Sequence, residues 1–175
     1  MIIGHQKQWE FLKKSFELGR ATHAYLFEGQ EGLGKKTLAI ELAKEILKED
    51  VSKKHHPDYV LIEPEKKEIQ IGQIRDFIWR LSLKPVLGQV KFAIINQAHS
   101  MNEEAQNCFL KTLEEPKGNA LMILITEYPQ MLLPTIRSRC EIIKFYPVKR
   151  SEIEKLSHRY FSKALPRPPQ SSLYP

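Results

Sequence analysis

Apolar residues gather in five short runs along the chain, separated by polar segments. Two of the runs, KFAIIN and ALMILIT at residues 91–96 and 120–126, are almost uninterrupted and predict strands that are buried in a parallel sheet. Three other runs predict further strands; they are HAYLFEG, DYVLIEP and EIIKF, at residues 23–29, 58–64 and 141–145. The chain is therefore expected to form five strands.

Between these strands, apolar residues recur at intervals of three and four, the spacing of amphipathic helices. Helices are expected at about residues 6–18, 35–47, 71–84 and 102–115. Pro85 and Pro116 end the last two, and Asn102 is the expected N-cap of the last one. Strands that alternate with helices in this way predict an α/β fold, with a five-stranded parallel sheet and helices on both faces.

The composition is that of a soluble globular domain: 175 residues, of which 42% are hydrophobic and 27% charged. The sequence has neither a run of about 18 apolar residues nor a basic-then-apolar leader, so a cytoplasmic protein is expected. The net charge of +6 favours polyanions, but the lysines are scattered and give weak support for DNA binding. Cys108 and Cys140 lack metal-ligand spacing and are expected to be buried as small apolar side chains.

A glycine-rich segment, GQEGLGKKT, follows the first expected strand and precedes the second expected helix. This is the strand–loop–helix context that a phosphate-binding loop requires. Gly29, Gly32 and Gly34 let the backbone turn its amides inward, where they and the helix N-terminus cradle phosphate. Lys35 stands where an ammonium reaches the β- and γ-phosphates.

The groups that make such a loop catalytic are replaced. Lys36 takes the place of the magnesium-binding Ser or Thr, and Thr37 comes one residue late. Asn96 and Gln97 occupy the places of the metal-binding Asp and of a water-activating Glu. An ammonium repels Mg²⁺, and neutral amides neither balance its charge nor accept a proton. We therefore expect no ATP hydrolysis and no required cofactor, with residual binding of ATP or phosphate left open.

Four segments resemble the δ′ family of bacterial DNA polymerase III clamp-loader subunits, which are AAA+ P-loop proteins. They are GQEGLGKKT, HPDYVLIEPE, FAIINQAHSMNEEAQNCFLKTLEEP and PTIRSRC, and the resemblance runs from about residue 3 to 149. It implies a three-layer α/β/α P-loop NTPase domain at 1–148, the beginning of a helical lid at 149–164 and an irregular tail at 165–175. Because relatives continue into a helical oligomerisation domain, the chain is interpreted as a fragment or a shortened relative.

The resemblance also implies a role in trans. Similar proteins carry an arginine in the motif SRC that reaches into the ATP site of the next subunit, and by that match Arg139 is the candidate arginine finger, framed by Ser138 and Cys140. Thr126 matches a polar residue that senses the γ-phosphate. The implied partners are the ATPase subunits and the clamp-opening subunit of the loader, the sliding clamp and primer–template DNA, with no membrane. Nucleotidyltransferase activity is expected to reside in other subunits of the holoenzyme.

Many relatives carry a zinc module of four cysteines before the HPDY segment, and this chain has no cysteine there. His55 and His56 are adjacent and lack partner ligands, so neither zinc nor another metal is expected. Two alternatives to a non-catalytic subunit stay open: an active or nucleotide-binding ATPase subunit of the same complex, and a basic DNA-binding module. ATP hydrolysis would favour the first, and tight, salt-dependent DNA binding the second.

Overall fold

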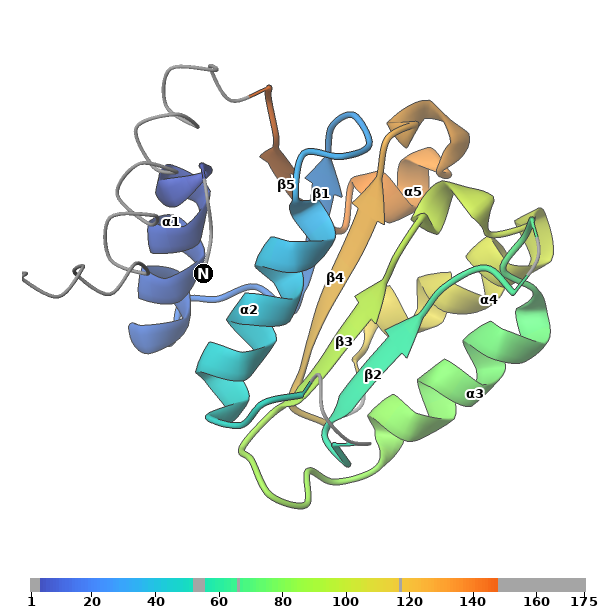
Figure 1. Ribbon diagram of the computed structural model, residues 1–175. Helices are drawn as coiled ribbons and strands as arrows, with labels where there is room; N and C mark the ends of the chain where they lie inside the picture. Colours follow the sequence, from blue (N-terminus) through green and yellow to red (C-terminus); the bar gives the residue numbers. More distant parts are fainter. Residues whose placement is uncertain (1–3, 52–55, 66, 117, 148–175) are drawn as a thin grey trace, which may run out of the picture.

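A computed structural model describes residues 4–51, 56–65, 67–116 and 118–147 (Figure 1). Its centre is a parallel sheet of five strands in the order β2-β3-β4-β1-β5. The strands are β1 (Ala24–Glu28), β2 (Tyr59–Ile62), β3 (Lys91–Ile95), β4 (Ala120–Thr126) and β5 (Glu141–Lys144). The predicted five-stranded parallel sheet is confirmed.

Helices cover both faces of this sheet, which gives the expected three layers. One face is covered by α1 (Gln6–Glu17) and α2 (Lys35–Leu47), and the other by α3 (Ile71–Ser82) and α4 (Glu103–Glu114) (Figure 1). Successive strand residues point to opposite faces, so that Leu26 packs in the core under α3 and α4 and Phe27 in the core under α1 and α2. The short elements are η1 (Ala98–Ser100), η2 (Pro129–Met131) and α5 (Pro134–Arg137).

Burial of the strands follows their place in the sheet. All five residues of β3 and six of the seven residues of β4 are buried, as the uninterrupted apolar runs predict. The edge strands β2 and β5 alternate or are largely exposed, and Ile142 of β5 is 39% exposed. The carboxyl ends of the central strands therefore meet at one fully supported edge, where the loops that follow them converge.

Side-chain caps define the beginnings of two helices. Asn102 accepts a hydrogen bond from the Ala105 amide at 2.9 Å, which confirms it as the N-cap of α4. Gln70 and Gln73 form a capping box at the start of α3. The expected lid at 149–164 and tail at 165–175 lie outside the described residues. Within the described part of the chain, no helix combines the length and the apolar character that crossing a membrane requires.

Candidate phosphate site and surface arginine

The glycine-rich loop connects β1 to α2 at the carboxyl edge of the sheet. Its first amide, on Gly29, donates to the Thr126 carbonyl at 3.2 Å and so joins the loop to the end of β4. A Cβ on Gly29 would lie 2.6 Å from the Phe145 carbonyl oxygen, so a larger residue does not fit there. Gly34 adopts a left-handed conformation (φ 79°) and begins α2 without a side-chain cap. The first-turn amides of α2 are thus left to an anion.

A cavity of about 300 Å³ lies between this loop and the ends of β3 and β4. It brings together most of the residues that the sequence assigns to the nucleotide site: Gly32, Gly34, Lys35, Lys36, Thr37, Asn96, Gln97 and Thr126. Gly29 lies beneath them at the base of the loop, where β1 ends. The predicted phosphate loop, the degenerate acidic motif and the predicted sensor therefore share one site.

Lys35 lines this cavity and is almost fully buried, with 7% of its surface exposed. Its ammonium donates to the carbonyl oxygens of Gly29 and Gln30, each at 2.5 Å. Burial lowers the pKa of Lys35, and the carboxylates of Glu31 and Glu127 act against that shift. The ammonium that the sequence directs at phosphate thus binds the carbonyl groups of its own loop in this structure.

Lys36, in the place of the magnesium ligand, forms an ion pair that the sequence did not predict. Its ammonium lies 2.9 and 3.0 Å from the two carboxylate oxygens of Glu63, the residue after β2. Asn96, the residue after β3, donates from its side-chain amide to the same carboxylate at 2.7 Å. One carboxylate therefore holds both residues that replace metal ligands.

Gln97, in the place of the water-activating glutamate, is exposed at the mouth of the cavity. It adopts a left-handed conformation (φ 53°, ψ 48°), which is uncommon for a residue other than glycine, and turns the chain from β3 into η1. Its amide carries no basic oxygen comparable to a carboxylate, so the position offers no general base.

Thr126, the predicted γ-phosphate sensor, is buried at the end of β4. Its hydroxyl accepts a hydrogen bond from the Tyr128 amide at 3.1 Å and lies 3.2 Å from Nδ1 of His99. The other ring nitrogen of His99 lies 3.8 Å from the Glu127 carboxylate, and burial lowers the pKa of His99. The hydroxyl is thus engaged by neighbouring protein groups.

Arg139 lies just after α5 and is not among the described residues that line the cavity. Its guanidinium donates from Nη1 to the Thr135 carbonyl at 2.9 Å and from Nη2 to the Glu114 carboxylate at 2.6 Å. The side chain is 34% exposed. Since a guanidinium carries five N–H donors, three donors are left for a further partner.

The two residues beside Arg139 have structural contacts. Ser138 donates from its hydroxyl to the Thr135 carbonyl at 3.1 Å and so closes the end of α5. Cys140 packs against the core under α3 and α4, and burial raises the pKa of its thiol to about 12. Cys140 and Cys108 are free, so the expectation that they form no disulfide is confirmed, but both are only partly buried rather than buried.

Sequence reasoning missed three polar residues at this site, Glu63, His99 and Glu127. His99 and Glu127 line the cavity, and Glu63 holds two residues that do. Glu63 and Glu127 each follow directly on a strand of the sheet. Because the carboxyl ends of parallel strands meet at one edge, polar residues at those positions were a usable signal.

Among the described residues, no group of three or more His, Cys, Asp or Glu side chains could hold a metal ion. His56 accepts a hydrogen bond from the Asp58 amide at 3.1 Å, and its other ring nitrogen lies 3.3 Å from the Glu49 carboxylate. His55 lies outside the described residues.

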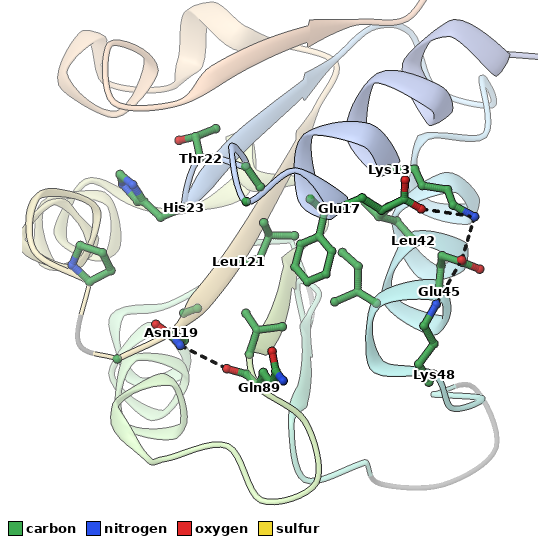
Figure 2. Close-up of a pocket in the computed structure, with 18 residues that line it drawn as sticks. Lys13, Glu17, Thr22, His23, Leu42, Glu45, Lys48, Gln89, Asn119 and Leu121 are labelled. Atoms are coloured by element: carbon green, nitrogen blue, oxygen red, sulfur yellow. Dashed lines mark hydrogen bonds and ion pairs between the residues drawn. The ribbon is translucent and has the colours of Figure 1, made fainter.

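A larger cavity, of about 640 Å³, opens at the opposite, amino end of the sheet (Figure 2). Figure 2 shows that its charged side chains pair with one another: the Glu45 carboxylate lies 2.8 Å from the Lys13 ammonium and 3.2 Å from that of Lys48. None of the residues predicted for the nucleotide site lines it. The smaller cavity, at the phosphate loop, is therefore the candidate site.

Comparison with known proteins identifies related sequences and structures. The family model described as DNA polymerase III, delta subunit, matches residues 4–149. The DNA polymerase III subunit delta' of Bacillus subtilis is 36% identical over 159 residues, which are 83% of this chain and 48% of that protein. The delta' subunit of Pseudomonas aeruginosa is 38% identical over 141 residues, which are 70% of this chain and 43% of that protein.

Among solved structures, a DNA polymerase III gamma subunit-related protein from Thermotoga maritima superimposes with a TM-score of 0.71 at 29% identity. That match covers 86% of this chain and 49% of the other. The chain thus spans about half the length of the curated relatives that it matches. With the predicted AAA+ P-loop fold confirmed, the chain belongs to the DNA polymerase III delta' family of clamp-loader subunits.

Proposed function

We propose that this chain is a non-catalytic clamp-loader subunit that supplies Arg139 to the ATP site of a neighbouring subunit. The observation that carries the proposal is the set of contacts and the exposure of the Arg139 side chain. Its guanidinium is fixed by two contacts, to Thr135 and Glu114, yet keeps three donors and a third of its surface free. It stands apart from the cavity of its own chain, so its free donors are available to another molecule.

The chemistry of an arginine suits this role. A guanidinium keeps its charge at any physiological pH, and its planar fork binds phosphate oxygens through two parallel hydrogen bonds. A finger supplied in trans raises the rate of phosphoryl transfer by roughly 10³ to 10⁵ in related systems. Glu114 and the Thr135 carbonyl hold the guanidinium in place, which reduces the entropy lost when it binds a phosphate group.

The chain's own cavity lacks the groups that hydrolysis needs. Asn96 and Gln97 replace the two carboxylates, and the nearby carboxylate of Glu63 is bound to Lys36 and Asn96. Among the described residues of this edge, no three or more His, Cys, Asp or Glu side chains are grouped so that they could hold a metal ion. We therefore propose that the chain neither hydrolyses ATP nor requires a metal or cofactor, zinc included.

The proposed partners follow from the family. The neighbours in the ring would be ATPase subunits such as the gamma and tau subunits found among the relatives, together with a clamp-opening subunit. Within that cytoplasmic assembly, the loader would act on a sliding clamp and primer–template DNA. The Thr126 hydroxyl, already engaged by His99 and Tyr128, would have no sensing role in a site that does not hydrolyse ATP.

The arginine finger is tested by reconstituting the loader with the full subunit carrying Arg139→Ala. We expect loss of the ATP turnover of the neighbouring site and impaired clamp loading, with assembly intact by gel filtration. Arg80→Ala is the matched control: Arg80 is an exposed arginine paired with Asp76 on α3, so the charge change is the same. Unchanged hydrolysis and loading by the Arg139→Ala loader would rule out the proposed role.

The lack of hydrolysis is tested on the chain alone. We expect no release of inorganic phosphate from ATP, with or without Mg²⁺, because Asn96 and Gln97 occupy the positions of the metal-binding and water-activating carboxylates. A turnover that Lys35→Ala abolishes would show an active site at this loop and would favour the catalytic ATPase alternative.

A further inference from the structure

The phosphate loop of a P-loop ATPase works with Mg²⁺, and the residues of this chain do not fit that ion. Lys36 presents an ammonium where a hydroxyl would bind the metal, and Asn96 presents an amide in place of a carboxylate. Thr37 carries a hydroxyl, but one residue further along the helix it is rotated by about 100°. The positions at which a P-loop ATPase binds Mg²⁺ are therefore occupied by an ammonium and a neutral amide, which do not suit a hard divalent cation.

The carboxylate that contacts Lys36 and Asn96 is that of Glu63, and its negative charge is already paired. Glu63 receives the Lys36 ammonium on both oxygens, at 2.9 and 3.0 Å, and the Asn96 amide on one of them, at 2.7 Å. Although burial acts to raise it, the pKa of Glu63 is held below its usual value by these hydrogen bonds. Glu63 is thus an ionised anchor for a cation that belongs to the protein.

We propose that the Lys36 ammonium, held by Glu63, takes the place of the divalent cation, so that the cavity binds the phosphate or polyphosphate group of a ligand without metal. The Lys36 ammonium donates two hydrogen bonds to Glu63, and its third N–H is left for a phosphate oxygen. Lys35 and Thr37, which like Lys36 belong to the first turn of α2, line the same cavity. Together they form an anion site in which the positive charges come from lysine side chains and not from a bound metal ion.

Two carboxylates set the strength of this site. Glu31 and Glu127 also line the cavity, and the negative charge of each acts to raise the pKa of Lys35. Because they offset part of the positive charge, anion binding depends strongly on Lys36. Added Mg²⁺ would approach a fixed ammonium while neutralising the ligand, and both effects oppose binding.

The experiment is a calorimetric titration of the chain with ATP and with pyrophosphate, each in EDTA and in excess Mg²⁺. We expect ATP to bind in EDTA and Mg²⁺ to leave its affinity unchanged or lower it. Lys36→Thr should weaken binding in EDTA about tenfold or more and make it dependent on Mg²⁺. Glu63→Gln should strengthen binding in EDTA, because it frees the Lys36 ammonium.

Lys14→Thr is the matched control, since Lys14 is exposed on α1 and does not line the cavity, and it should leave binding unchanged. Circular dichroism checks that each variant is folded. Binding of both ligands supports a polyphosphate site, and binding of ATP alone supports a nucleotide site of the same kind. Stronger binding in Mg²⁺, no binding in EDTA, or a Lys36→Thr variant that behaves as the original chain would each overturn the proposal. None of these results bears on Arg139, which is tested in the assembled loader.

Discussion

An ion pair lies at each end of strand β2, and the two pairs, one with Lys91 of β3 and one with Lys36 of α2, differ in burial. At the amino end, Asp58 and Lys91 are 0% and 3% exposed and lie 3.3 Å apart. At the carboxyl end, the side chains of Glu63 and Lys36 are both 42% exposed and lie 2.9 Å apart. Strand β2 is thus flanked by one pair that is closed to solvent and one that is open to it.

The carboxylate of the closed pair accepts four hydrogen bonds. The Asp58 carboxylate accepts the backbone amides of Val86, Leu87 and Gly88 at 2.7 to 2.8 Å. Lys91 adds its own hydrogen bond to Asp58 and also donates to the Pro57 carbonyl at 3.0 Å. Asp58 therefore holds the connection between α3 and β3 against the sheet.

The difference separates a structural charge from one that is available to a ligand. The buried pair is partnered by protein groups and closed to solvent, so it fixes the chain and is out of reach of a ligand. The Lys36 ammonium has one N–H to spare and opens onto a cavity. By the same criterion Arg139, with a third of its side chain exposed and three free donors, resembles the open pair.

The largest effect is expected from Asp58→Ala. It leaves the Lys91 ammonium and three backbone amides buried without their carboxylate, which should cost about 3 to 5 kcal/mol in the free energy of unfolding. Urea denaturation followed by circular dichroism measures this, and a chain that no longer folds agrees with it. A loss below about 1 kcal/mol, the level of an exposed pair, would show that the two ends do not differ.

The second prediction concerns pH. Although burial acts to raise it, hydrogen bonds from Gly88, Val86, Leu87 and Lys91 lower the pKa of Asp58 from 3.8 to about 2. Because the folded-state pKa is depressed, the stabilisation is fully present above about pH 4 and is lost as the pH falls through about 2. It amounts to about 2 kcal/mol.

The measurement is the difference in unfolding free energy between the unaltered chain and Asp58→Asn, taken from pH 5 down to about pH 2. Since Asn does not titrate, the difference should shrink across this range as Asp58 takes up a proton. A difference that is constant with pH would mean that the Asp58 carboxylate has an ordinary pKa in the folded protein.

The parts of the fold that depend on local pattern could be predicted from the sequence. The apolar runs of β3 and β4, the Asn102 cap and the loop before α2 each show within about ten residues, because periodicity, capping and turn chemistry are local effects. The replaced residues were likewise found by local position: Lys36 follows the lysine of the glycine-rich loop, and Asn96 follows β3 directly.

The partners of those residues could not be predicted in the same way. Lys36 and Glu63 are 27 residues apart, and Glu63 and Asn96 are 33 apart. Their contacts therefore exist only once α2, β2 and β3 have assembled. The hydrogen bonds of Lys35 to its own loop and of Arg139 to Glu114 depend on side-chain conformations that no spacing specifies. A single sequence therefore identifies which residues meet at the edge but not which atoms pair.

The smallest expected effect is on stability at the open end. Lys36→Thr or Glu63→Gln should each change the unfolding free energy by about 0 to 1 kcal/mol, since the attraction between half-exposed charges is screened by water. The same two variants should nevertheless shift anion binding in opposite directions. Urea denaturation and the binding titration on the same samples test both statements. A loss as large as that of Asp58→Ala would make Lys36 and Glu63 a structural pair, and the open end of β2 would then serve the fold rather than a ligand.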